Sequence, residues 1–358
     1  MGGRRGTSWR VRLALTVVVA SLTVGSCTGS GEHEDAGHQE TANPSPAPPP
    51  LDRAALTRGI DDALGSSTGL YDRVRAVLVT QEGRPVVRLH YGPGARGPAD
   101  LRDVTASVVG TLVGIAEADG LLDLDAPLSQ LLPDYGDHMT AAVAAITLEQ
   151  LLTMTSGLPG DADGAPFERG ADWVAAILDL GVTGEPGTFV YSSAGSHLLA
   201  AVLTEATGTS LLDLARERLF EPLGVDPPVA WPADPQGVQL GYAGLELSAD
   251  DLLALGRLYL DHGRRRDVQV VPEEWVREAT TNHLELPDVS GMGFGYQWWT
   301  TALEDHEGFA ALGSGGQVLE VVPDLALVAV ATSEDRRSFV GPMSLLQTIN
   351  DTVALQLG

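Results

Sequence analysis

The chain has 358 residues, with 22 basic and 48 acidic side chains and a formal net charge of −26 at pH 7. All of the basic residues are arginine, so the chain contains no lysine. This charge excludes a nucleic-acid-binding protein, which needs a basic face to neutralise phosphates, and the single cysteine excludes an internal disulfide or a cysteine-based metal cluster.

The first 26 residues have the pattern of a secretory leader. Four arginines precede an apolar stretch at residues 13–24, which is shorter than the roughly 20 residues needed to span a bilayer. Small residues then lead to Cys27 in a Val-Gly-Ser-Cys sequence that resembles a bacterial lipobox. We expect residues 1–26 to be a lipoprotein signal peptide and Cys27 to carry the lipid. An ordinary signal peptide followed by an incidental thiol is the alternative.

The segment after Cys27 is predicted to be a spacer. Residues 27–50 are rich in glycine, proline, serine and acidic side chains and contain almost nothing to bury, a composition typical of disordered tethers. Residues 51–358 show no linker or repeat and are interpreted as one domain. The chain is therefore expected at the extracytoplasmic face of the cell membrane, held there by lipid.

The domain begins with strands and continues into a buried helix. Residues 77–80 and 86–91 are β-rich and are joined by a turn-like segment, which predicts a hairpin. Residues 104–119 are apolar on most sides and end at Gly120, a pattern typical of a buried helix.

Helices are predicted in the middle of the domain and strands again near its end. Thr147 and Gln150 form a capping box that opens a helix ending near residue 157, and Ser248 is a predicted N-cap. The remaining predicted elements are helices at 194–207, 248–262 and 345–357, and strands at 318–322 and 325–331 with a turn between them. Strands at both ends predict an α/β (α+β) fold, with a sheet built from the two chain ends around a helical middle.

Several segments resemble the penicillin-recognising serine hydrolases, which include serine β-lactamases, DD-peptidases and related esterases and amide hydrolases. The resemblance rests on residues 113–127, 146–157, 187–193, 207–208, 219–224, 295–299 and 311–317. Two of these segments, 295–299 and 311–317, look more like the esterase and nylon-oligomer-hydrolase branch. The order and spacing of these matches, over about 280 residues, imply a β-lactamase/DD-peptidase-like fold, with an antiparallel sheet flanked by helices and a helical subdomain.

The family's catalytic Ser-x-x-Lys motif is missing. Residues at i and i+3 share a helix face, which allows a lysine amine to deprotonate the serine hydroxyl. Aligned without gaps, these two positions are Asp103 and Ala106. Ser107 starts the nearest alternative register, but Gly110 then stands in the lysine position. Because the chain has no lysine, no serine in any register has one at i+3.

Two further family elements are altered. The Tyr-x-Asn element is Tyr191-Ser192-Ser193, which keeps the tyrosine and lacks the carboxamide. The Lys/His-Thr/Ser-Gly element is Ala311-Leu312-Gly313, which has lost its cation. By resemblance, we expect a binding cleft lined by Ser193, Gly313, Ser314, Gly315 and Gly316.

Each candidate catalytic residue also has a structural interpretation. We interpret Asp103 as a helix cap and not a catalytic carboxylate, because aspartate is among the best N-caps. Ser107 is interpreted as a packed hydroxyl, the alternative being a rescued nucleophile. Tyr191 is a relic base, a ligand contact or a core aromatic residue. His197 lies four residues after Ser193 and within its reach, but no acid is placed in the sequence to orient it.

Metal and cofactor sites are not expected, since the eight histidines show neither His-x-His nor HExxH spacing. The leading hypothesis is a catalytically degenerate member that keeps its cleft for a cell-wall peptide, a small amide or ester, or a protein partner. The alternative is an active hydrolase of amide or ester bonds that uses Tyr191 with Ser107 or Ser193. A third possibility is a structural envelope protein whose cleft is filled by side chains.

Overall fold

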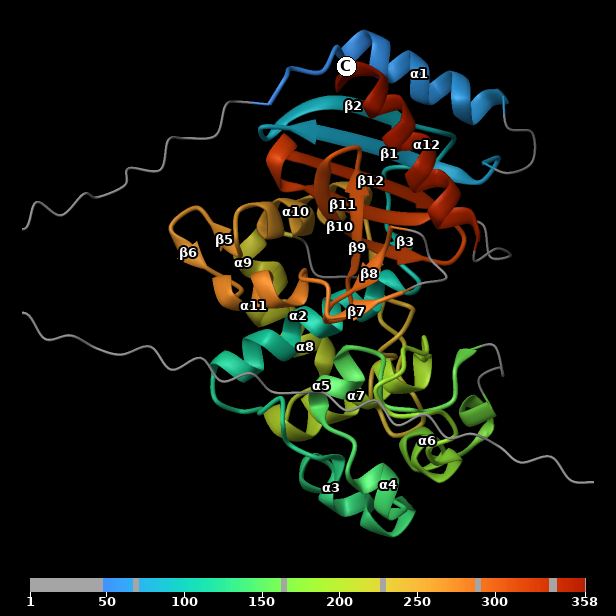
Figure 1. The fold of residues 1–358 in the computed structure, drawn as a ribbon, viewed down its shortest axis with the longest axis vertical. Coiled ribbons are helices and arrows are strands. Elements are labelled where there is room, and N and C mark those ends of the chain that lie inside the picture. Colours follow the sequence, from blue (N-terminus) through green and yellow to red (C-terminus); the bar gives the residue numbers. More distant parts are fainter. Residues whose placement is uncertain are drawn as a thin grey trace, which may run out of the picture. The chain divides into compact units, whose positions relative to one another are not determined.

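The computed structural model describes residues 48–66, 71–161, 166–225, 230–286, 291–334 and 340–357, and Figure 1 shows the fold. The predicted signal peptide, Cys27 and nearly all of the predicted spacer lie outside these residues.

An eight-stranded antiparallel sheet organises the domain, in the order β2-β1-β12-β11-β10-β9-β8-β7. Its strands are β1 Val74–Gln81, β2 Arg84–His90, β7 Leu284–Glu285, β8 Gly293–Phe294, β9 Trp299–Leu303, β10 His306–Gly313, β11 Gln317–Val322 and β12 Leu327–Ser333. Strands from the start and the end of the domain meet where β1 pairs with β12. The predicted sheet built from both chain ends is therefore confirmed, as is the predicted hairpin of β1 and β2.

The two faces of the sheet pack against different helices. Successive side chains of a strand point to opposite faces, and in β12 Ala329 and Ala331 join one apolar cluster while Val328 and Val330 join another. The first cluster includes residues of α1 (Arg53–Ser66) and α12 (Val340–Leu357). Figure 1 shows these two helices on the same side of the sheet.

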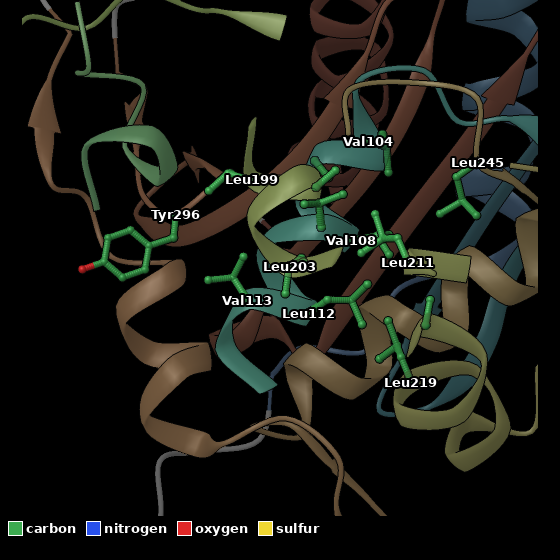
Figure 2. Close-up of a cluster of buried hydrophobic side chains, with 14 of the residues drawn as sticks. Val104, Val108, Leu112, Val113, Leu199, Leu203, Leu211, Leu219, Leu245 and Tyr296 are labelled. Atoms are coloured by element: carbon green, nitrogen blue, oxygen red, sulfur yellow. The ribbon is translucent and has the colours of Figure 1, made fainter. Parts of the chain in front are cut away.

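The second cluster surrounds α2 (Val104–Ala118), which the sequence predicted. All residues of α2 from Val104 to Ala116 are buried. Figure 2 shows Val108 and Leu112 of this helix among leucines from other elements, including Leu203 and Leu219. A helix that is apolar all round must be enclosed in this way, and the enclosure fixes the direction in which its first turn points.

The remaining helices form most of the middle of the domain. They are α3 Leu128–Leu131, α4 Ala141–Ala144, α5 Leu148–Leu152, α6 Trp173–Leu180, α7 Ser193–Thr207, α8 Leu211–Ala215, α9 Glu221–Leu223, α10 Ala249–Leu260 and α11 Glu273–Ala279. Two small sheets pair β3 Ala99–Asp100 with β4 Glu246–Leu247, and β5 Arg264–Arg265 with β6 Val268–Gln269. None of the described helices is by itself long and apolar enough to span a membrane; only the pair Ser193–Thr207 and Leu211–Leu223, bent by 81°, passes that test together.

The predicted helices are confirmed, and two of them differ clearly in extent. The capping box of Thr147 and Gln150 opens α5, but this helix ends at Leu152, because Met154 has a positive φ of 59° and its carbonyl accepts the Val190 N–H. Helix α12 begins five residues before the predicted start. Helix α1 was not predicted, since only Leu56 and Ile60 of its 14 residues are buried and the apolar pattern is sparse.

Candidate functional site

Asp103 stands directly before α2, but its side chain does not cap that helix. The residue occupies the N-cap position, yet its carboxylate makes no capping hydrogen bond. Instead, Oδ2 accepts the backbone N–H of Ser314 at 2.7 Å. The predicted helix cap is therefore wrong: the side chain reaches from the start of α2 to the end of β10, where a long-range donor replaces the local ones.

The segment that follows β10 supplies this donor. Ser314, Gly315 and Gly316 lie in the turn between β10 and β11, and both glycines have a positive φ, of 87° and 105°. At Gly313, a Cβ atom would lie 2.5 Å from the Leu101 carbonyl oxygen. A glycine is thus required where the segment before α2 crosses β10, and this close approach brings Asp103 to Ser314.

Ala106 and Ser107 lie near the start of α2, and both are buried. Ala106 is buried and its methyl group can neither take up nor release a proton. Ser107 is also buried, and its hydroxyl donates to the backbone carbonyl of Gln297 at 2.6 Å. The interpretation of Ser107 as a packed hydroxyl is confirmed by this contact, because its Oγ lies inside the core.

Tyr191 lies in an aromatic wall of the site. Its ring is stacked on Trp299, with centroids 6.1 Å apart and planes inclined by 11°, and Phe294 meets it edge-on. Tyr191 and Trp299 line a small cavity of about 10 Å³ together with Met292, Leu312, Pro342 and Met343. This size admits at most about one water molecule.

Burial raises the pKa of Tyr191 well above its ordinary value, and the negative charges of Asp103 and Asp161 raise it further. The phenol therefore keeps its proton at neutral pH, and the side chain acts as a hydrogen-bond donor and not as a base. Tyr191 lines the small cavity described above, and its surroundings oppose the role of a relic base.

Ser193 is held by Asp161, a residue that the sequence analysis did not identify. Ser193 is the first residue of α7, and both its backbone N–H and its hydroxyl donate to the two oxygens of Asp161, each at 2.7 Å. Burial raises the pKa of Asp161, the bonds from Ser193 oppose this, and Asp103 and Glu168 raise it further. Nothing in the sequence pattern links these residues, which lie 32 positions apart.

His197 does have an acid partner, so the prediction that none is placed to orient it is wrong. Its Nε2 lies 3.1 Å from Oδ2 of Asp234, and neither side chain is exposed. Nδ1 accepts the Gly241 N–H at 3.4 Å, which assigns the ring proton to Nε2. Because Ser193 bonds to Asp161 instead, His197 and Ser193 do not form a dyad.

Asp234 is held as a carboxylate by this arrangement. Burial acts to raise its pKa, but the hydrogen bonds from His197 and from the backbone N–H groups of Val238 and Gln236 outweigh burial and lower it. The contact between His197 and Asp234 thus links the segment that contains Asp234 to α7, so the role of this pair is structural.

The charge of the cleft is the reverse of what the resemblance implies. The positions expected to hold cations are Ala106 and Ala311, both buried, whereas Asp103 and Asp161 add carboxylates. The neighbouring Arg102 is paired with Asp100, at 3.2 Å. Within the described ranges, no group of three or more histidine, cysteine, aspartate or glutamate side chains is arranged to hold a metal ion.

Comparisons with known proteins agree with this architecture. A family model described as Beta-lactamase matches residues 71–346. Penicillin-binding protein 4 of Amycolatopsis lactamdurans is 28% identical, over 67% of this chain and 74% of that protein. The 6-aminohexanoate-dimer hydrolase of Paenarthrobacter ureafaciens is 25% identical, over 81% of this chain and 79% of the relative. The class C beta lactamase of Rhodobacter sphaeroides superposes with a TM-score of 0.66 at 19% identity, over 82% of this chain and 98% of its own. The predicted fold class is confirmed.

Proposed function

Because this chain belongs to the beta-lactamase family of serine hydrolases, we propose that it is a member that no longer hydrolyses and keeps the family's cleft for binding. The observation that carries the proposal is the contact between Asp103 and Ser314. An aspartate at the nucleophile position supplies no hydroxyl, and its carboxylate also occupies a backbone donor at the cleft. Preorganised donors of this kind are what stabilise a developing oxyanion in acyl transfer.

The absence of a lysine anywhere in the chain gives independent support. A serine hydroxyl must lose its proton to attack a carbonyl, and an arginine stays protonated and cannot accept it. The hydroxyl of Ser107 is buried and engaged, and Tyr191 retains its proton.

The charges of the cleft favour a neutral or amine-bearing ligand over a carboxylate. The N–H of Ser314 and both donors of Ser193 are occupied by Asp103 and Asp161. A ligand carboxylate held about 5 Å from Asp103 would be repelled by about 3 kcal/mol at an effective dielectric constant of about 20. We therefore propose a small amide or a peptide with a free amine, a class that includes the dimer named in one relative and amine-bearing cell-wall peptides.

Binding is tested by thermal stabilisation with three probes: 6-aminohexanoate dimer, an amine-bearing muropeptide and benzylpenicillin. We expect the two amides that carry a free amine to raise the melting temperature, with the amine toward Asp103 and the carboxylate away from it. Benzylpenicillin, which carries a carboxylate and no free amine, should have no effect. Asp103→Asn is the matched variant, because it removes the charge and keeps the shape. The binding proposal fails if none of the probes stabilises the protein, and that result would favour the structural envelope protein.

An active hydrolase is the second candidate, favoured by one contact. The Ser193 hydroxyl donates to Asp161 at 2.7 Å, and a carboxylate in that position can accept a proton. The same carboxylate also accepts the Ser193 backbone N–H at the start of α7, an arrangement that stabilises a helix N-terminus. We therefore assign the contact a structural role.

Covalent labelling separates the two candidates. Intact-mass measurement after long incubation with a fluorophosphonate is expected to show no adduct. An adduct that disappears in Ser193→Ala, and persists in Ser107→Ala, would replace our proposal with the active hydrolase.

We further propose that a lipid on Cys27 anchors the protein at the extracytoplasmic face of the membrane. Support comes from the lipobox-like sequence, the short apolar stretch before it and the polar residues after it. Cys27→Ser should move the protein from the membrane fraction to the medium and abolish incorporation of a labelled fatty acid. If Cys27→Ser stayed in the membrane fraction while the wild type still incorporated the fatty acid, another anchor would hold the protein at the membrane.

A further inference from the structure

A glutamate lies in the apolar layer between the sheet and its outer helices. Glu320 is in the middle of β11 and has no exposed surface. Val318 and Val322, two residues to either side, belong to the cluster under α1 and α12. Since residues two apart share a face, Glu320 points toward α12. Its cross-strand neighbours, Ala310 and Ala329, are small.

One oxygen of Glu320 is well satisfied and the other is not. Oε1 accepts from the side-chain amide of Asn350 in α12 at 3.0 Å and from the Thr301 hydroxyl at 3.2 Å. Within the described part of the chain, two buried oxygens near this contact have no hydrogen-bond partner: Oε2 of Glu320 and Oδ1 of Asn350. An unpartnered buried polar atom destabilises the folded state, so two such atoms in one contact need an explanation.

A proton on Oε2 satisfies both atoms at once. A carboxylate has only acceptors, whereas a protonated carboxyl has one O–H donor. The amide already donates from Nδ2 to Oε1, and a donor on Oε2 facing Oδ1 closes the second bond of a planar acid–amide pair. We propose that Glu320 is protonated in the folded protein and joins Asn350 through two hydrogen bonds, forming a proton-dependent lock between β11 and α12.

Among the residues that the structure describes, no ionic partner competes for this carboxyl. Neither β9 nor β12 carries a charged residue. The neighbouring strand β10 carries His306 and Glu307 at its far end, and the only charged residue of α12 is Asp351, which is exposed and accepts from Gln347. Burial raises the pKa of Glu320 to about 7, opposed only by the bonds from Asn350 and Thr301.

The contact between Glu320 and Asn350 also bears on the cavity beside Tyr191, because α12 contributes residues to both. Met343, which lines the cavity beside Tyr191, precedes Asn350 by seven residues, or about two helical turns. Ionisation of Glu320 would leave a charge in the apolar layer and loosen the helix that forms this wall.

The direction of the pH effect follows from the two protonation states. The folded state holds the proton up to about pH 7, whereas the unfolded carboxyl releases it near 4.5. The stabilisation is therefore complete below pH 4.5 and is lost as the pH rises through about 7. The unfolding equilibrium constant should rise tenfold per pH unit in this interval, or about 300-fold in all, relative to a variant that cannot titrate.

The test compares unfolding by denaturant across this pH range in the wild type, Glu320→Gln and Glu307→Gln. Glutamine keeps the shape of the side chain and can pair with Asn350 without a proton. The unfolding constants of the wild type and Glu320→Gln, plotted against pH, should therefore diverge between pH 4.5 and about 7. Glu307→Gln, an exposed residue on β10, should run parallel to the wild type. Parallel curves for Glu320→Gln and the wild type would overturn the proposal.

A second variant covers the case in which Glu320→Gln does not fold. Asn350→Leu keeps the carboxyl and removes its amide partner. Hydrogen exchange of the α12 amides should then be faster than in the wild type below pH 7. The difference should shrink as the pH rises through about 7, because the wild type then loses the bond from the Glu320 proton and keeps only the bond from the Asn350 amide. Equal exchange at every pH would mean that the acid–amide pair is not formed.

Discussion

Replacing Asp103 by alanine tests the contact on which the proposed function rests. Its carboxylate accepts the Ser314 N–H at 2.7 Å, and a hydrogen bond to a charged group contributes about 1.5–3 kcal/mol. Asp103 is partly exposed, so water can reach Ser314 in the variant and the lower end of that range applies. We expect Asp103→Ala to lower the free energy of unfolding by about 1.5 kcal/mol, or the melting temperature by about 3 °C for a domain of this size.

Asp103→Asn separates charge from shape. Its amide oxygen can still accept from Ser314, but a neutral bond is about half as strong, so the expected loss is about 0.7 kcal/mol. Denaturant unfolding measures both variants, with the exposed Asp137→Ala as control. Both Asp103 variants should also lower the pKa of Tyr191, because they remove a negative charge that raises it. A fully stable Asp103→Ala with an unchanged tyrosine titration would refute the contact in solution.

Three further predictions concern neighbouring groups. The double substitution of Asp103→Ser and Ala106→Lys should restore at least slow labelling by penicillin, seen by intact mass; a folded, unlabelled variant would mean that the cleft has changed beyond the motif. Asp234→Asn should cost about 2–3 kcal/mol of unfolding free energy, because its NH₂ group would face the Nε2–H of His197; unchanged stability would show that the pair is not formed. In the wild type, the lowered pKa of Asp234 means that its stabilisation is present at neutral pH and is lost as the pH falls through that pKa, whereas Asp234→Asn should lack this acid-side loss. Ser107→Ala should cost about 1 kcal/mol and leave probe labelling unchanged; loss of labelling in an otherwise labelled protein would identify Ser107 as a nucleophile.

Local signals in the sequence predicted local structure well. The capping box at Thr147 and the glycine that follows α2 mark helix ends through contacts a few residues away. The antiparallel sheet was also predictable, because β11 and β12 are mostly apolar and their pairing needs only a short turn.

Contacts between distant segments were not predictable in the same way. Asp103 is a favourable N-cap by its residue type, but its acceptor role is decided by Ser314, which lies 211 positions later. Similarly, His197 appeared to lack an acid because Asp234 lies 37 positions away in an irregular segment. These pairs depend on how the chain packs, which residue type and spacing do not encode.

The hydrogen bond between Asp103 and Ser314 also bears on how this fold can change during evolution. In active enzymes, the groups that bind a substrate often have no partner within the protein itself. Such a site lowers the stability of the fold, which is the known trade-off between activity and stability. Here those groups are already partnered within the chain. Under the proposed function, regaining catalysis would therefore destabilise the fold, which gives such a lineage a physical reason not to return to an active enzyme.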